Sequence, residues 1–400
     1  MKLSSSPTLR IVGKPAGWMA KLGLLLASLA LALLAVEACT RLMFEVPMSS
    51  VENWVVHRTS LLKAHANAVY DPLLGWILRP GLMSDLEPGG IASGEFGIRM
   101  NQFKISKVPR GGILCSGDSF TAGSEVGDAD TWPAHLEKII KTPVVNAAAG
   151  GWGSDQIILR VESLLDPLDP KAVVVSFLVD DIQRVKYRIY GGANKPWFEL
   201  KDGELIPHNN PVPIFSGKVD EIGFWRSVFG HSFFLTKLAE RLAWKAWWLD
   251  GQVYVEEPVD AVAVTVALMK RLNYNLSDRG IPLIFLLQYG GSQITQWKDE
   301  PDWAKKTYLG IESLGIPTVN TWGPLRKLHT ERGQPALDKL YVMRDNGKIH
   351  GHMSSEGNKF VAELIAPALL KVLEDKKTSP WPEGTTKKPI KIRATPFTSP

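Results

Sequence analysis

The stretch "GGILCSGDSFTAG", residues 111–123, places Ser119 directly after a short apolar run. A serine hydroxyl becomes an effective nucleophile when a histidine within hydrogen-bond reach takes its proton. Such a histidine is available in "HGHMSSEGN", residues 350–358, which lies just before a segment with helical periodicity. By itself "GDS" is also common turn sequence, so Ser119 is either a nucleophile or a turn residue that closes a buried strand.

From residue 111 onward, short apolar and β-branched runs alternate with helical segments, which is typical of βα units with a parallel sheet. We expect strands at 112–117, 143–148, 172–179, 281–288 and 316–321, and helices at 131–141, 153–165, 257–278, 300–313 and 354–375. The strands are too continuously apolar for a sheet with one solvated face. The sequence therefore predicts an α/β three-layer sandwich with a central parallel sheet of flavodoxin-like type.

Polar side chains follow several of these strands, and ligands of a doubly wound sheet bind at the carboxyl ends of its strands. Ser119 follows the first strand, the glycine-rich "NAAAGGWGSDQ" (146–156) follows the second, and "LVDDIQR" (178–184) follows the third. Glycines let the backbone approach a ligand closely, and helix N-termini direct N–H groups at an anion. The candidate substrate-binding residues are Asp118, Asn146, Trp152, Asp181, Arg184 and His350.

These blocks resemble those of the SGNH (GDSL-type) hydrolase superfamily over about residues 111–372. The resemblance implies that Ser119 is the nucleophile, that its N–H and that of Gly151 contribute to an oxyanion hole, and that His352 is the base. The stretch "YDPLLGWILRP" at 70–80 is also similar to one in the stalk of membrane-anchored bacterial members.

Two positions depart from the family pattern. Asp180 stands where the family usually has an asparagine, and Ile349 and His350 stand where it has an aspartate shortly before the histidine. An ionised Asp180 would repel a negatively charged oxyanion. Asp180 is therefore protonated, or its side chain points away from the oxyanion hole, or the oxyanion hole is weaker than in the family. Asp345 is the nearest acid that could orient His352, and a backbone carbonyl supporting a Ser-His dyad is the alternative.

Two of these side chains have alternative roles. Arg184 could pair with Asp180 or Asp181, or reach the ligand, although a surface ion pair is the simpler use. His350 is a weak candidate metal ligand, because no third ligand accompanies the H-x-H spacing.

Residues 22–36, "LGLLLASLALALLAV", form an unbroken apolar run after a basic N-terminus. Glu37 lies where small residues are needed, so it disfavours cleavage by signal peptidase and lipidation at Cys39. We therefore expect 18–42 to be an uncleaved transmembrane anchor. The basic flank then predicts that residues 1–17 are cytoplasmic and that the main domain is exported. The resemblance to membrane-anchored bacterial proteins implies an anchor in a bacterial inner membrane and a periplasmic main domain. A buried core helix is the alternative.

The remaining chain divides by composition. We expect a stalk and leader at 43–110, the main domain at 111–375 with an insertion at 183–256, and a disordered tail at 376–400. Tryptophans 244, 247 and 248 in the insertion could face a sugar or a membrane, but their helical spacing favours packing against the domain. Much of the +5 net charge lies at the two ends, which argues against nucleic-acid binding. Cys39 and Cys115 cannot pair, because one lies in the membrane segment.

The sequence thus predicts an exported, anchored serine esterase or O-acyltransferase that forms an acyl-Ser119 intermediate and needs no cofactor. The resemblance suggests acyl groups on a cell-envelope or exported polysaccharide, or another small acyl ester, and contact with polysaccharide machinery. A non-catalytic carbohydrate-binding module of an envelope assembly complex is the main alternative. A plain α/β domain, in which "GDS" is only a turn, requires three clusters at strand ends to coincide by chance.

Overall fold

The computed structural model describes residues 16–54, 67–85, 90–214, 223–241 and 254–378. The chain forms two compact units. Unit 1 comprises Met1–Arg58 and Gly217–Gly251, and unit 2 comprises Thr59–Ser216 and Gln252–Pro400.

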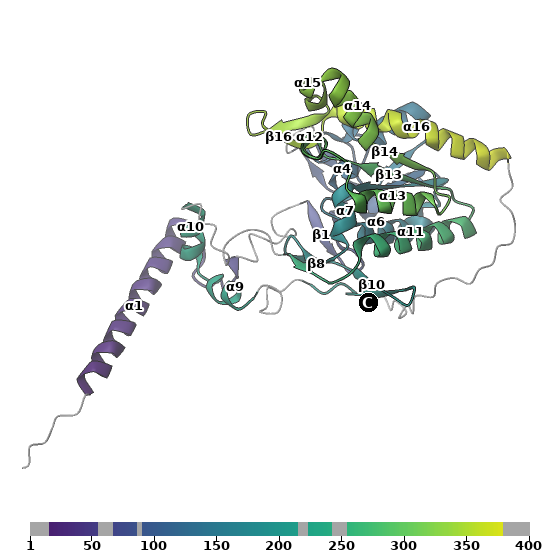
Figure 1. Ribbon diagram of the computed structural model, residues 1–400. Coiled ribbons are helices and arrows are strands. Elements are labelled where there is room, and N and C mark those ends of the chain that lie inside the picture. Colours follow the sequence, from purple (N-terminus) through teal and green to yellow (C-terminus); the bar gives the residue numbers. More distant parts are fainter. Residues whose placement is uncertain (1–15, 55–66, 86–89, 215–222, 242–253, 379–400) are drawn as a thin grey trace, which may run out of the picture. The chain divides into compact units, whose positions relative to one another are not determined.

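Unit 2 is built on a five-stranded parallel sheet of order β14-β13-β7-β5-β6 (Figure 1). Its strands are β5 (Ile113–Ser116), β6 (Val144–Asn146), β7 (Ala172–Leu178), β13 (Leu283–Gln288) and β14 (Thr318–Asn320). Numbered along the chain, the order is 2-1-3-4-5, which is the flavodoxin-like doubly wound arrangement. The predicted α/β fold and its five strands are confirmed.

Helices cover both faces of this sheet. The helices α5 (Trp132–Ile140) and α16 (Ser355–Thr378) pack on each other on one face, while α6 (Ser154–Leu168), α11 (Ala261–Asp278) and α13 (Asp302–Glu312) form the layer on the other. The strands β5, β7 and β13 are buried throughout, because neither face of the sheet meets water. The predicted helices agree with these bounds to within about four residues.

Several short elements at the carboxyl edge of the sheet escaped the sequence prediction. They are the helices α4 (Ser119–Ala122), α7 (Val179–Arg184), α12 (Gly291–Gln296), α14 (Trp322–Arg332) and α15 (Gln334–Asp338), the 3-10 helices η1 (Glu95–Gly97) and η2 (Asp128–Asp130), and the hairpin β15 (Tyr341–Arg344) with β16 (Ile349–Met353). Most are too short to show a helical or alternating period in the sequence.

The leader before the main domain is not wholly irregular, as the sequence suggested. Within unit 2 it forms the hairpins β1 (Ala68–Asp71) with β2 (Gly75–Leu78) and β3 (Met83–Ser84) with β4 (Ile91–Ala92). Trp76 on β2 is only 1% exposed. The leader therefore contributes to the core of unit 2.

The predicted insertion 183–256 is divided between the two units. Its two ends pair within unit 2, where β8 (Tyr187–Tyr190) lies between β9 (Ala193–Asn194) and β12 (Val255–Glu256), and β10 (Trp197–Lys201) pairs with β11 (Glu204–His208). Its middle part belongs to unit 1. Tryptophans 244, 247 and 248 lie outside the described residues, as do 379–400, whereas α16 continues to Thr378, past the start of the predicted tail.

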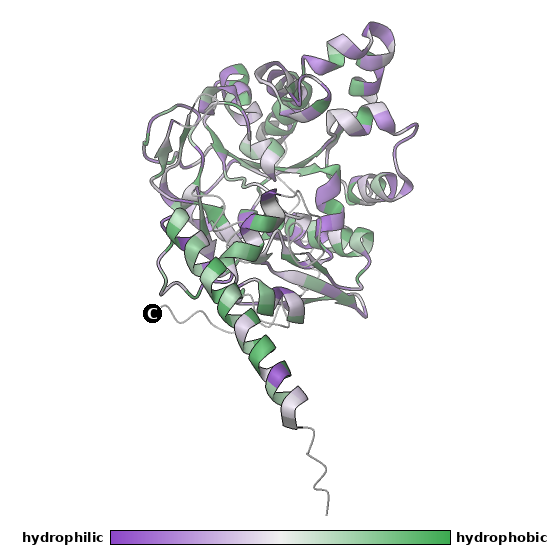
Figure 2. Cartoon of the chain, turned by 90° about the vertical axis from the view of Figure 1, so that its left-hand side faces the viewer, coloured by the Kyte–Doolittle hydropathy of each residue, from purple (hydrophilic) through white to green (hydrophobic). Residues whose placement is uncertain are grey.

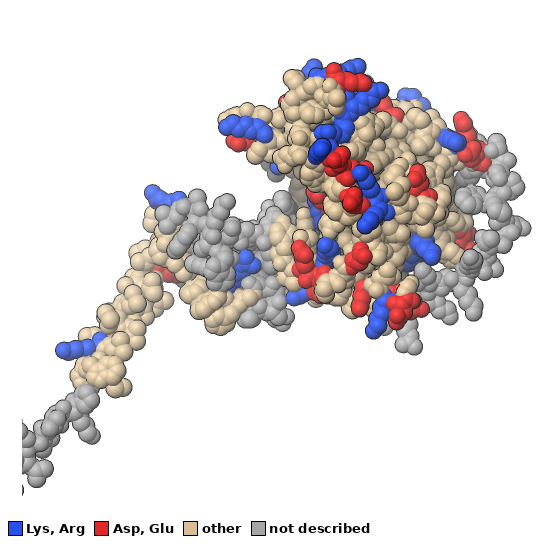
Figure 3. Space-filling view, viewed as in Figure 1, with Lys and Arg blue, Asp and Glu red and all other residues tan. Residues whose placement is uncertain are grey.

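Unit 1 contains α1 (Ala16–Met43), α9 (Phe224–Phe229) and α10 (Phe233–Arg241). Residues Gly17–Met43 are long and apolar enough to cross a membrane, which is equally true of a signal sequence near the N-terminus. Figure 2 shows α1 coloured as hydrophobic along most of its length. On the face of unit 2 drawn in Figure 3, acidic and basic side chains lie beside one another.

A buried ion pair ties the start of α6 to the β8–β9 hairpin. Lys195 Nζ contacts the Asp155 carboxylate and donates to the carbonyl oxygens of Tyr187 (3.1 Å) and Pro196 (2.9 Å). Both charged side chains are fully buried. Burial raises the pKa of Asp155 and lowers that of Lys195, and each charge offsets this effect on the other.

We therefore expect Lys195→Met to lower the free energy of unfolding by about 3 kcal/mol, because it leaves Asp155 as an unpaired buried charge. The measurement is thermal unfolding of the full chain. Lys201→Met, at an exposed position of β10, is the matched control and should change stability little. Equal unfolding temperatures for the two variants would contradict the role of the pair.

Candidate active site

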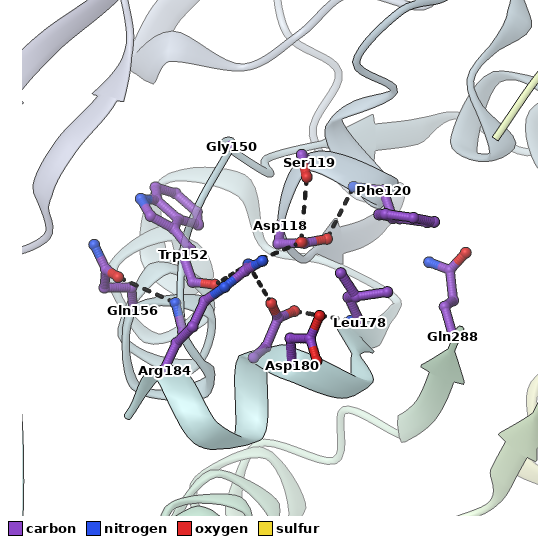
Figure 4. Close-up of polar contacts among 12 residues, drawn as sticks. Asp118, Ser119, Phe120, Gly150, Trp152, Gln156, Leu178, Asp180, Arg184 and Gln288 are labelled. Carbon is purple, nitrogen blue, oxygen red and sulfur yellow. Dashed lines mark hydrogen bonds and ion pairs between the residues drawn. The ribbon is translucent and has the colours of Figure 1, made fainter. Parts of the chain in front are cut away.

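Ser119 is the first residue of α4 and follows β5 by a tight turn. Asp118 caps α4, accepting the Phe120 N–H at 2.8 Å, and its other oxygen lies 3.3 Å from Ser119 Oγ (Figure 4). A Cβ on Gly117 would lie 2.8 Å from the Ser176 carbonyl oxygen on β7, so this turn requires glycine. As the first helical residue, Ser119 has an N–H without an intrahelical partner.

The glycine-rich loop after β6 approaches Ser119. A Cβ on Gly150 would stand 3.8 Å from Ser119 Cβ, and Gly151 adopts a left-handed φ of 77°. Trp76 of the leader holds this loop, because its Nε1 donates to the Gly150 carbonyl at 2.9 Å. Trp152 Nε1 in turn donates to the Trp76 carbonyl at 3.0 Å.

One cavity of about 410 Å³ brings four of the predicted residues together: Ser119, Gly151, Arg184 and His352. Much of its remaining lining is apolar or aromatic. These side chains are Trp76, Ile77, Leu78, Ile91, Ala148, Ala149 and Tyr190.

Glu125 orients His352, a role that the sequence prediction gave to Asp345. Its Oε2 lies 2.8 Å from His352 Nδ1 and accepts the His352 backbone N–H at 2.7 Å. Arg344 Nε donates to the other oxygen at 2.6 Å. Burial opposes ionisation, but these hydrogen bonds outweigh it and lower the pKa of Glu125 to about 2.

A carboxylate at Nδ1 favours the tautomer of the neutral imidazole that carries its hydrogen on Nδ1 and leaves Nε2 as an acceptor. Asp345 instead lies in the exposed turn between β15 and β16, so the expectation that it supports His352 is corrected to Glu125.

Two backbone features give Glu125 this position. Glu125 itself has a left-handed φ of 72°, which is costly for a residue with a side chain. A Cβ on Gly351 would lie 2.6 Å from Glu125 Oε2 and 2.9 Å from Arg344 Nε. The glycine of "HGH" is therefore what lets the carboxylate reach His352.

Arg184 is a buried link between three loops and not the surface ion pair expected. Its Nη1 lies 3.0 Å from Asp118, 2.5 Å from Asp181 and 3.1 Å from the Trp152 carbonyl (Figure 4). The Asp181 carboxylate also accepts the Leu178 N–H at 2.8 Å. Asp118 and Asp181 are fully buried and are engaged within the protein.

Asp180 points away from the Ser119 cavity. Both of its carboxylate oxygens lie 3.0 Å from Gln293 Nε2, and it lines a second cavity of about 320 Å³. His352 borders both cavities. Burial raises the pKa of Asp180, although the positive charge of Arg184 partly opposes this.

The other candidate substrate-binding residues have structural contacts. Asn146 is buried and donates to the Thr121 carbonyl at 3.0 Å, and the Trp152 side chain is fully buried. His350 Nε2 lies 2.8 Å from Asp338, which ties β16 to α15. The structure thus gives Asn146, Trp152 and His350 roles in supporting loops.

No family model and no curated protein matches the chain. Solved structures with a similar architecture include a putative lipolytic protein of G-D-S-L family from Desulfitobacterium hafniense DCB-2, with 13% identity over 64% of this chain and 97% of that chain and a TM-score of 0.35. The acetyl xylan esterase AlAXEase is 12% identical, with 64% of this chain and 98% of that chain covered, and has a TM-score of 0.38. Axe2, an acetylxylan esterase from Geobacillus stearothermophilus, is 13% identical, with 67% of this chain and 96% of that chain covered, and has a TM-score of 0.35. These likenesses are distant, so the roles proposed below depend on this chain's own side chains.

If Glu125 orients His352, Glu125→Gln should lower kcat for an ester substrate by about 10²-fold or more with little change in KM, because the imidazole loses its preferred tautomer. The measurement is steady-state ester hydrolysis by variants that unfold at the same temperature as the wild type. Asp345→Asn is the matched control and should keep kcat within a factor of two. A larger loss from Asp345→Asn than from Glu125→Gln would overturn the assignment.

Proposed function

We propose that the chain is a serine enzyme that cleaves or transfers an acyl ester, with Ser119 as nucleophile, His352 as general base and Glu125 as the acid behind the histidine. The observation that carries the proposal is the Glu125–His352 contact at the border of the cavity that Ser119 lines. In the described residues no hydrogen bond occupies His352 Nε2, so this nitrogen is available to the serine.

The reaction follows from these positions. His352 Nε2 takes the Ser119 proton as Oγ bonds to the ester carbonyl carbon, which places a negative charge on the carbonyl oxygen. The N–H groups of Ser119 and Gly151 stabilise that charge. The intermediate collapses to an acyl-Ser119 ester, and His352 gives its proton to the departing alcohol oxygen. Water or a sugar hydroxyl then attacks the acyl carbon while His352 takes its proton, and His352 returns this proton to Ser119 Oγ as the bond between the acyl carbon and the serine oxygen breaks.

A cluster of three tyrosines supports an acylated carbohydrate as substrate. Tyr190 lines the Ser119 cavity, and its ring centroid lies 5.0 Å from that of Tyr254 and 5.6 Å from that of Tyr187. Tyr254 is 45% exposed. Burial raises the pKa of Tyr190 to about 12, so its hydroxyl stays protonated. Exposed rings with polar tips can hold a sugar by both its C–H face and its hydroxyls.

The cellular setting belongs to the same proposal. The apolar span of α1, its basic flank and the absence of a favourable cleavage site support a single-pass anchor in a bacterial inner membrane with the enzyme domain in the periplasm. An acylated envelope or exported polysaccharide is then the substrate class within reach.

The nucleophile is tested with a fluorophosphonate probe and with ester turnover. We expect the wild type to be labelled and to release acyl product, and Ser119→Ala to do neither, because alanine has no oxygen to form the acyl-enzyme. Ser124→Ala, a nearby serine that also lines the cavity, is the control and should still be labelled. Glycan binding retained equally by wild type and Ser119→Ala, without any turnover, would favour the binding module.

The carbohydrate site is tested at Tyr254. We expect Tyr254→Ala to raise KM for an acetylated oligosaccharide about two- to tenfold, the value of one aromatic contact, and to leave p-nitrophenyl acetate hydrolysis unchanged. Tyr254→Phe keeps the ring and should recover most of the wild-type KM, with only the contribution of the hydroxyl lost. Equal effects on both substrates would argue against a sugar site.

Adding an unacylated glycan as an acceptor and analysing the products separates acyl transfer from ester hydrolysis.

A further inference from the structure

Unit 1 attaches two short helices to the end of the apolar span. Glu37, near the C-terminal end of α1, accepts hydrogen bonds from Ser232 Oγ (2.8 Å), Phe233 N (2.8 Å) and Phe234 N (2.9 Å). The N–H groups of Phe233 and Phe234 are at the start of α10, where they have no partner within the helix. The acidic residue that interrupts the sequence after the apolar run therefore caps a helix almost two hundred residues further along the chain.

Arg41, one turn after Glu37, extends this connection. Its Nε lies 2.7 Å from the Glu37 carboxylate. Its guanidinium also donates to the carbonyl oxygens of Ser50 at 2.7 Å and His231 at 3.4 Å. The end of α1, the segment after it and the start of α10 are thus held by one charged pair.

The helix α9 is held by the segment that follows α1. Asn53 Nδ2 donates to the carbonyl oxygens of Arg226 (3.2 Å) and Ser227 (3.4 Å), and the Trp54 N–H donates to that of Gly230 at 2.7 Å. These bonds satisfy carbonyl groups at the C-terminal end of α9. Their donors follow the last residue of α1 by about ten positions.

One side of α9 is left apolar and exposed. Its side chains are Phe224 (56% exposed), Trp225 (48%), Val228 (49%) and Phe229 (37%). Trp225 and Phe229 stack at 5.5 Å, so they form one continuous surface. Phe44 and Met48, after the end of α1, are also more than half exposed.

We propose that α9 and α10 lie on the membrane surface, with the exposed side of α9 inserted at the boundary between lipid headgroups and acyl chains. Continuity with the apolar span argues for lipid as the occupant, because the contacts of Asn53 and Glu37 keep both helices at the end of α1. Tryptophan and phenylalanine are favoured at this depth, where an apolar ring meets a polar boundary. Arg241, exposed at the end of α10, provides positive charge for the lipid phosphates.

The same contacts bear on the fate of α1. Cleavage at any bond after Glu37 would remove this residue and leave the first N–H groups of α10 without their acceptor. The Glu37 contacts thus favour an uncleaved anchor, whose end is part of a folded unit. This inference rests on the proposed membrane anchor and is independent of catalysis at Ser119.

The test uses the full chain with Cys39→Ser, reconstituted in nanodiscs of phosphatidylcholine and phosphatidylglycerol. Cys115 is buried and stays unlabelled. A cysteine at Val228→Cys, or at Phe224→Cys as a second position, carries an environment-sensitive fluorophore. Lipids with a nitroxide near the headgroup end of the acyl chain should quench this fluorophore about twofold or more.

Leu309→Cys on α13 is the matched control, an apolar side chain that is 57% exposed and that the proposal does not place in lipid. Its fluorophore should be quenched little. If neither α9 position is quenched more than the Leu309 position, the exposed side of α9 is not in lipid and the proposal fails, including the case in which a protein partner covers it.

Discussion

One guanidinium shared by two buried carboxylates organises the candidate active site. Arg184 joins Asp118, which caps the nucleophile helix, to Asp181, which caps α7, and also holds the loop carbonyl of Trp152. Burial alone would suppress ionisation, and it does raise the pKa of Asp181. The two carboxylates nevertheless outweigh burial at Arg184 and raise its pKa. Removing one partner of such a group typically costs about 3–5 kcal/mol.

The consequence is that the loops after β5, β6 and β7 are positioned together. Each loop is short and contains glycine or turn residues, and none would be rigid alone. The leader adds a second link, because Trp76 donates to the Gly150 carbonyl and accepts from Trp152. A nucleophile and its oxyanion donors must be placed to within a fraction of an ångström, and these links provide that rigidity.

The sheet and its covering helices could be predicted from sequence because their signals are local. β5, β7 and β13 are continuous apolar runs bounded by Gly, Pro or Asp, and burial on both faces requires that pattern. The meeting of Ser119 and Gly151 at one cavity was also predictable, because motifs at the carboxyl ends of neighbouring parallel strands converge. His352 lies on β16 of the antiparallel hairpin, and its place at this cavity was expected from the family resemblance alone.

Glu125 could not be found in the same way. It lies 227 residues before His352, outside any motif, and reaches the histidine through a left-handed backbone and the missing side chain of Gly351. The local hint in the sequence was an acidic residue, Glu125, between Gly123 and Gly127 and soon after Ser119. The sequence could not predict that the middle of the insertion 183–256 belongs to unit 1. This assignment depends on contacts between distant segments, such as the capping of α10 by Glu37.

Asp180 shows how the structure resolves a conflict that the sequence raises. A carboxylate in place of a donor would repel a developing oxyanion, but both of its oxygens face Gln293 and the neighbouring cavity. The side chain therefore neither donates to the oxyanion nor opposes it at close range. In the proposed mechanism, stabilisation of the charge then depends on the backbone N–H groups of Ser119 and Gly151. Loss of one donor usually costs about 10²-fold in rate, so turnover should be slow unless the substrate supplies compensating contacts, as the tyrosine cluster would for a carbohydrate.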